Sequence, residues 1–289
     1  MLFQEYPMTE QQLQTLYINA CELELQAFKP GNVSIYSDAH DMTASDFIKS
    51  ARVSAPAICN RNYSLGEKIY YAIQATREAV ACNTNLGIVL LCAPLLQAYQ
   101  NRQSDQSLRD ALHQVLSCTT QEDCHWVYKA IRIAAPGGLG NVDQQDVQLA
   151  PDVTLQEAMF IASDQDLIAR QYISDFREIF DFTILEYNEK TDLNHDLAHI
   201  AVLLYTKFLE KYPDSHIQRK FGAIYNTEIS EKMSVMHQML QSGHFSHYMQ
   251  ELHELDAWFK TNKINPGTTA DLIVATFVTV FLEQLIRIS

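Results

Sequence analysis

The sequence predicts an all-α protein, a single compact multi-helix domain over residues 1–289 with buried central helices. Apolar residues recur at the helical period of about 3.6 residues in nearly every segment. Capping-box patterns, Ser or Thr followed three residues later by Glu, Gln or Asp, precede many of these segments. No alternating run of β-branched residues is long enough for a strand. We therefore expect about ten helices and no sheet.

Capping boxes mark the expected helix starts, because the two side chains satisfy each other's unpaired backbone N–H groups. The pairs at this spacing are Thr9/Gln12, Thr43/Asp46, Ser64/Glu67, Thr120/Asp123, Thr154/Glu157 and Thr268/Asp271. Amphipathic helices are expected at 9–28, 43–59, 65–81, 105–117, 120–135, 154–173 and 192–211, with a further helix that carries Phe180 and Glu186.

Two segments are apolar on every side, which is typical of helices buried inside a protein. The first runs from Leu86 to Leu96 and follows Asn83-Thr84-Asn85, while the second runs from Leu272 to Leu282. Pro94 lies inside the first and predicts a kink near Leu90, the residue whose carbonyl loses its backbone donor. Both runs are too short to span a bilayer.

The overall charge excludes some classes of partner. The formal net charge is −14, from 21 basic and 35 acidic residues, which argues against non-specific binding to nucleic acid or to an anionic membrane. The six cysteines form no CxxC pair and predict reduced, mostly buried thiols. Residues 1–8 lack the basic and apolar regions of a signal peptide. We expect a cytoplasmic protein that binds neither nucleic acid nor membranes.

Glu24 is the first candidate functional residue. It lies on the apolar face of the first expected helix with Leu13 and Tyr17, and a carboxylate on a buried face is costly unless it is paired or functional. The turn Phe28-Lys29-Pro30-Gly31-Asn32 ends this helix and brings a cation, Lys29, and an amide, Asn32, within reach of Glu24. A salt bridge without a catalytic role explains the pattern equally well.

The start of the first apolar helix is a candidate binding site. Unpaired N–H groups and the positive end of the helix dipole can hold a phosphate or a carbonyl, here beside Asn83, Thr84 and Asn85. An ordinary Asn N-cap is the favoured alternative for this stretch taken alone. The second apolar helix has a similar polar entrance, which contains Gly267, Thr268, Thr269 and Asp271.

Cations and glycines elsewhere extend the set of candidates. Arg132 precedes a glycine-rich stretch in which Gly137 and Gly138 would let the backbone approach a ligand, although a flexible connection explains the glycines as well. Asp214 begins a turn before the basic pair Arg219-Lys220, which is unusual in so acidic a chain.

Asp166 shares the apolar face of the expected helix 154–173, and pairing with Arg170 one turn later would account for it. His195 and His199 have the i, i+4 spacing of a metal-binding pair, but both are expected to point away from the apolar stripe of their helix.

Taken together, these motifs resemble those of the triphosphoribosyl-dephospho-CoA synthases. The resemblance consists of Glu24 with Lys29–Val33, His40-Asp41-Met42 with Phe47 and Ser50, Asn83–Gly87, Asp214 with Arg219-Lys220, and Pro266-Gly267 with Ala270–Leu272. It covers most of the chain in order. The resemblance implies an all-helical transferase in which a ribose 2′-hydroxyl of dephospho-CoA displaces adenine from ATP and the triphosphate stays attached.

The chain departs from the better-known synthases at Asn85-Leu86, where those enzymes have a His-Lys pair. With Pro-Gly-Gly-Leu-Gly at 136–140, it is similar to a branch in methylotrophs and archaea that accompanies pterin-dependent one-carbon genes. That similarity leaves the acceptor open between dephospho-CoA and one linked to one-carbon cofactor metabolism.

The resemblance and the residue patterns predict a site that uses Mg²⁺ with ATP. One carboxylate would stabilise positive charge on the sugar and a second would act as general base. We expect Glu24, Asp214 and Asp271 to be catalytic, and Asp166 to be a candidate Mg²⁺ ligand. The residues expected to bind substrate are Lys29, Asn32, Asn83, Thr84, Asn85, Arg132, Gly137, Gly138, Arg219, Lys220, Gly267, Thr268 and Thr269.

The predicted substrates are ATP and dephospho-CoA or a related acceptor, and the pattern allows a homodimer. Two other classes of function compete. A helical metal-dependent phosphohydrolase would use the His-Asp dipeptides at 40–41 and 195–196 as metal ligands, and a non-catalytic helical module would keep the pocket for binding only.

Overall fold

The computed structural model describes residues 8–38, 42–135, 147–192 and 195–288, and this part of the chain is all-α, as predicted. The first helices are α1 (Glu10–Gln26), α2 (Ala44–Ile58), α3 (Leu65–Val80), α4 (Leu86–Asn101), α5 (Leu108–Ser117), α6 (Gln121–Ala134), α7 (Leu155–Ala162) and α8 (Leu167–Ile173). A π-helical turn (Ile179–Thr183) leads into α9 (Ile184–Asp192), α10 (Leu197–Lys211), α11 (Ser215–Phe221), α12 (Asn226–Gln241), a 3₁₀ turn (Phe245–Tyr248), α13 (Met249–Thr261) and α14 (Gly267–Ile288).

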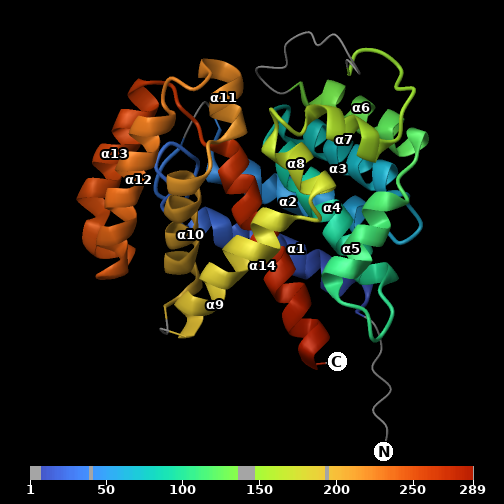
Figure 1. The fold of residues 1–289 in the computed structure, drawn as a ribbon, viewed down its shortest axis with the longest axis horizontal. Helices are drawn as coiled ribbons and strands as arrows, with labels where there is room; N and C mark the ends of the chain where they lie inside the picture. The colour runs from blue at the N-terminus through green and yellow to red at the C-terminus, as the bar shows by residue number, and fades with distance from the viewer. Residues whose placement is uncertain (1–7, 39–41, 136–146, 193–194, 289) are drawn as a thin grey trace, which may run out of the picture.

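The two expected central helices form the middle of the bundle. Figure 1 shows α14 running through the molecule between α10 with α12 and α13 on one side and α4 with α5 on the other. α14 packs against α4, α1 and α10, and all of α4 from Leu86 to Leu96 is buried. α14 is long and apolar enough to cross a membrane by length and composition, but 67% of its most apolar window is buried inside the protein. Apolar burial in the bundle therefore accounts for its composition.

Five of the six expected capping boxes are present with both hydrogen bonds, at the starts of α1, α2, α3, α6 and α7. The sixth prediction is wrong, because α14 begins at Gly267 and Thr268 is already helical. Asp271 is thereby released from a capping role, and its side chain lies against Gly87 at the start of α4.

Two expected helices are shorter than their periodicity suggested. The expected helix 154–173 is broken, because Asp166 is the N-cap of α8 and accepts hydrogen bonds from the backbone N–H groups of Ile168 and Ala169. The expected helix 192–211 starts at Leu197 with Asp196 as its N-cap. In both cases an Asp side chain satisfies the first N–H groups of a helix, and this preference outweighs the continuous apolar stripe.

Pro94 leaves α4 continuous from Leu86 to Asn101. The Tyr172 hydroxyl donates a 2.6 Å hydrogen bond to the carbonyl of Leu90, the residue four positions before Pro94. A side-chain donor from α8 thus takes the place of the missing N–H and ties α8 to the central helix.

Candidate active site

A cavity of about 510 Å³ lies where the end of α1 meets α8, α11 and the starts of α4 and α14. Residues distant in sequence line it together, and they include most of the predicted site. The predicted residues on its wall are Glu24, Asn32, Asn83, Thr84, Asn85, Asp166, Arg219, Lys220, Gly267, Thr268 and Asp271. The two polar helix entrances predicted from the sequence therefore face one cavity.

Glu24 is buried on the last turns of α1, 3% exposed, and forms an ion pair with Lys29 at 3.0 Å. The Lys29 ammonium donates to the backbone carbonyls of Glu24, Ala27 and Val33 at 2.9, 3.3 and 2.8 Å. Burial raises the pKa of Glu24, and the Lys29 charge opposes that rise. Lys29 is fully buried and absent from the cavity wall, so the structure gives no support to its predicted contact with a triphosphate. It fixes Glu24 instead.

Asp271 lies in the first turn of α14 and faces the first turn of α4. A Cβ built on Gly87 would come within 2.0 Å of Asp271 Oδ2, so only glycine fits beside this carboxylate. Burial, together with the charges of Glu24 and Asp214, raises the pKa of Asp271 well above its ordinary value. No Lys or Arg of the described residues forms an ion pair with Asp271.

Asp214 does not fit the predicted role of a catalytic carboxylate. It is the N-cap of α11 and accepts hydrogen bonds from the backbone N–H groups of His216 and Ile217. Its other oxygen accepts from the Thr269 backbone N–H at 2.7 Å and from the Thr269 hydroxyl at 2.8 Å. Asp214 is 2% exposed and lies off the cavity wall. It joins two helix starts, and Thr269 serves this junction rather than the cavity.

Asp166 is likewise committed to protein contacts. One oxygen caps α8, and the other accepts a hydrogen bond from the Arg219 guanidinium. The predicted pairing with Arg170 is wrong, since Arg170 lies nearer Glu178, at 3.9 Å. With both oxygens occupied, Asp166 is a poor candidate for a Mg²⁺ ligand.

Arg219 and Lys220 bring positive charge to the cavity from one turn of α11. Arg219 Nε is buried without a hydrogen-bond partner, and Lys220 donates to the Lys263 carbonyl at 2.9 Å. Arg132, also predicted to bind substrate, donates to the Val147 carbonyl and is not on the wall. The charged donors of the described wall are therefore gathered at α11.

The start of α4 differs from a simple Asn N-cap. Asn85 is the N-cap residue but its side chain makes no capping bond, whereas Asn83 Oδ1 accepts from the Leu86 N–H at 3.2 Å. The Thr84 hydroxyl bonds to the Ser50 hydroxyl, and Asn85 Nδ2 donates to the Ser54 hydroxyl at 3.3 Å. The polar side chains thus connect α4 to α2.

The polar entrance of α14 meets the turn after α1, because Asn32 Nδ2 donates to Asn265 Oδ1 at 2.9 Å. The wall also includes Met42, Phe47 and His216, which the sequence did not single out as binding residues. His216 lies two residues after Asp214 and packs beside Gly267. A position beside a predicted turn was the only sequence signal for it.

The remaining predictions concern two glycines and the His-Asp motifs. Gly137, Gly138, His40 and Asp41 lie outside the described residues. His199 is fully buried rather than pointing outward, and burial lowers its pKa to about 4. His195 precedes α10, and its ring packs edge-on against that of His199 with the ring centroids 4.6 Å apart. Across the described ranges, no group of three His, Cys, Asp or Glu side chains is placed to hold a metal ion.

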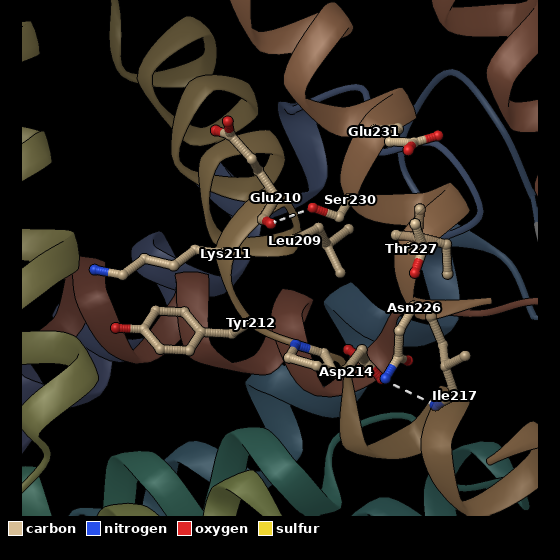
Figure 2. Close-up of a pocket in the computed structure, with 12 residues that line it drawn as sticks. Leu209, Glu210, Lys211, Tyr212, Asp214, Ile217, Asn226, Thr227, Ser230 and Glu231 are labelled. Carbon is tan, nitrogen blue, oxygen red and sulfur yellow. Dashed lines mark hydrogen bonds between the residues drawn. The ribbon is translucent and has the colours of Figure 1, made fainter. Parts of the chain in front are cut away.

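A second cavity, of about 440 Å³, lies on the other side of the Asp214 turn, between the end of α10 and the start of α12. Figure 2 shows Glu210 and Glu231 above the turn and Lys211 extending away from it. Its apolar wall includes Leu209, Ile217 and Ile229. It also carries charged groups, Glu210, Asp214, Glu231 and Lys211, but apart from Asp214 none of the residues predicted for the site line it. Most of the predicted residues line the first cavity, which is therefore the candidate active site.

Comparisons with known proteins identify the family of the chain. A search of curated proteins finds no match. A crystal structure described as that of a triphosphoribosyl-dephospho-CoA synthase from Archaeoglobus fulgidus shares the fold, with a TM-score of 0.61 and 24% identity over 81% of this chain and 96% of that one. The sequence profile of the ATP:dephospho-CoA triphosphoribosyl transferases matches residues 10–288. The chain belongs to this transferase family.

Proposed function

We propose that the chain transfers the triphosphoribosyl group of ATP to the ribose 2′-hydroxyl of dephospho-CoA or a related acceptor. The hydroxyl oxygen forms a bond to C1′ of ATP, the C1′–N9 bond breaks, and adenine leaves with the electron pair and a proton. One observation carries the proposal: Glu24, Asp271 and the Arg219-Lys220 pair line the same cavity. Transfer of a charged sugar needs both signs of charge at one place.

Glu24 is proposed as the general base. The Lys29 ion pair fixes its carboxylate, and burial raises its pKa toward the range in which a base accepts protons efficiently. Asp271 lies on the facing helix with a raised pKa, and the positive charge that develops on the sugar as the base departs would favour its ionised form and be stabilised by it. This assignment replaces Asp214, whose oxygens are held by four donors.

Arg219 and Lys220 are proposed to bind the triphosphate. Arg219 Nε has no hydrogen-bond partner, so a phosphate oxygen would satisfy a buried donor there. Asp271 forms no ion pair with a Lys or Arg of the described residues, and it fits a Mg²⁺ ion carried by the triphosphate. When bound, Mg²⁺ would neutralise part of the negative charge of the triphosphate.

The reaction is tested by incubating the protein with ATP, Mg²⁺ and dephospho-CoA and separating the products by chromatography. We expect free adenine in a 1:1 ratio to the new conjugate. ADP or inorganic phosphate in its place would refute triphosphoribosyl transfer. Adenine that appears only with a one-carbon carrier as acceptor would keep the reaction and change the acceptor.

Glu24→Gln should lower the rate of adenine release by roughly 10²- to 10⁴-fold, because the amide cannot accept the hydroxyl proton. The matched control is Glu22→Gln on the same helix, since Glu22 is more exposed and pairs with Arg52 at the surface. Unchanged turnover of Glu24→Gln would remove Glu24 from the mechanism.

A further inference from the structure

A third and much smaller void adjoins the 510 Å³ cavity of the candidate active site. Its volume is about 10 Å³, close to the space that one water molecule needs. Tyr17, Cys21 and Glu24 from α1 and Asn85 from the start of α4 contribute to its lining. Glu24 and Asn85 also line the main cavity, so the void adjoins the proposed catalytic carboxylate.

The hydrogen bonds around Ser54 determine how the Asn85 amide is oriented. The Ser54 hydroxyl donates its single hydrogen to the Ser50 carbonyl at 2.7 Å. It must therefore accept from Asn85 Nδ2, at 3.3 Å, and from the Tyr17 hydroxyl, at 3.1 Å. A flipped amide would place two acceptors against each other. Asn85 Oδ1 consequently faces away from Ser54, and it is buried with no hydrogen-bond donor among the described residues.

Glu24 Oε1 is buried and lies 3.0 Å from Lys29 Nζ. The ammonium has three hydrogens, and three backbone carbonyls compete for them with the carboxylate. A carboxylate oxygen has two lone pairs, so the ion pair leaves Oε1 able to accept a further hydrogen bond.

We propose that the void is a binding site for a single water molecule that donates one hydrogen to Glu24 Oε1 and the other to Asn85 Oδ1. A buried amide oxygen without a donor is costly and a buried carboxylate is stabilised by a further donor, and a water is the small molecule that offers two donors in a space of this size. Both oxygens belong to residues that line the same void. The water connects α1 to α4 across it.

The bound water makes Asn85 a positioning residue for Glu24, and this consequence rests on the proposed function. With Oε1 held by the water and by the Lys29 charge, the other carboxylate oxygen is left for the substrate. A donor to the carboxylate favours its charged form. Loss of the water would raise the pKa of Glu24 further, and the activity would then be lost at a higher pH as the solution is acidified.

The first test is a crystal structure of the full chain at a resolution that shows single waters. We expect one ordered water within hydrogen-bonding distance of both Glu24 Oε1 and Asn85 Oδ1. A direct contact between the two side chains, or a void without density, would overturn the proposal. This result does not depend on which reaction the protein catalyses, so it separates the water site from the proposed function.

The second test is the pH profile of kcat/KM for Asn85→Leu, whose side chain removes the acceptor and fills the void. The acid limb should move up by about one pH unit, because a hydrogen bond to a charged group of this kind is lost. Gln97→Leu is the matched control, since Gln97 is also an α4 amide with a buried oxygen that lacks a partner, but it lies away from both cavities that Glu24 lines. An unshifted limb in Asn85→Leu, or an equal shift in Gln97→Leu, would refute the positioning role.

Discussion

At the scale of single residues, burial alone did not separate catalytic from structural carboxylates. Glu24 and Asp214 are both almost fully buried, and burial raises the pKa of each. They differ in their partners. Four hydrogen bonds occupy Asp214, whereas Glu24 is held by one cation and still lines the cavity. A carboxylate can take part in the reaction only if one of its oxygens is still able to accept a proton or a hydrogen bond from the substrate.

Gly87→Ala tests the position of Asp271. Alanine is favoured over glycine in a helix by about 1 kcal/mol, yet the new Cβ would meet Asp271 Oδ2 at 2.0 Å and force that carboxylate to move. We expect kcat/KM to fall by at least about 100-fold, as for a misplaced catalytic group. The control is Gly243→Ala, where the nearest atoms are side-chain atoms at 3.2 and 3.3 Å. Full activity of Gly87→Ala would place Asp271 outside the reaction.

At the scale of secondary-structure elements, the site is formed by the termini of four helices. α4 and α14 start at the cavity, α1 ends there, and α11 presents its cations to it. Asp214 joins the start of α11 to the start of α14. Its carboxylate caps α11 and accepts two hydrogen bonds from Thr269 in the first turn of α14. Short polar contacts between helix ends therefore position the charged groups.

Asp214→Ala should lower the free energy of unfolding by about 3 kcal/mol, since a cap and two bonds to a charged acceptor are lost together. Asp196→Ala is the comparison, as Asp196 caps α10 and otherwise contacts only His244, and its side chain is exposed, so a loss of about 1 kcal/mol is expected. Denaturant unfolding measures both values. Equal losses in the two variants would argue against the junction between α11 and α14.

At the scale of the whole molecule, the protein must bind a polyanion despite a net charge of −14. Arg219 and Lys220 are the cations on the described part of the cavity wall. Polyphosphate binding should therefore depend on the two cations of α11. It should also weaken as the salt concentration rises, because dissolved ions screen the attraction between these cations and the phosphates, and the negatively charged remainder of the protein adds no attraction.

Arg219→Met should weaken the binding of inorganic tripolyphosphate by roughly 10- to 100-fold, the effect of losing one charge-assisted contact. Titration calorimetry measures the affinity directly. Arg52→Met is the control, because the Arg52 side chain is 63% exposed and pairs with Glu22 at the surface. Unchanged binding by Arg219→Met would place the phosphates elsewhere in the cavity.

The sequence by itself determined the features that depend on neighbours within one helical turn. Five capping boxes, the two buried central helices and the inward face that carries Glu24 all follow from spacings of three or four residues. The predicted helices 154–173 and 192–211 were too long, because an Asp at position 166 or 196 is compatible both with a continuing helix and with the N-cap of a new one.

Only the tertiary structure decided which polar residues are free to act. Asp214 finds Thr269 across 55 positions, and Asp166 finds Arg219 across 53. Lys29 donates to three backbone carbonyls only 5, 2 and 4 positions away, a conformation of the turn after α1 that the spacing of side chains does not specify. Each buried polar group must find a partner somewhere in the fold, so its remaining chemistry is known only when those partners are known.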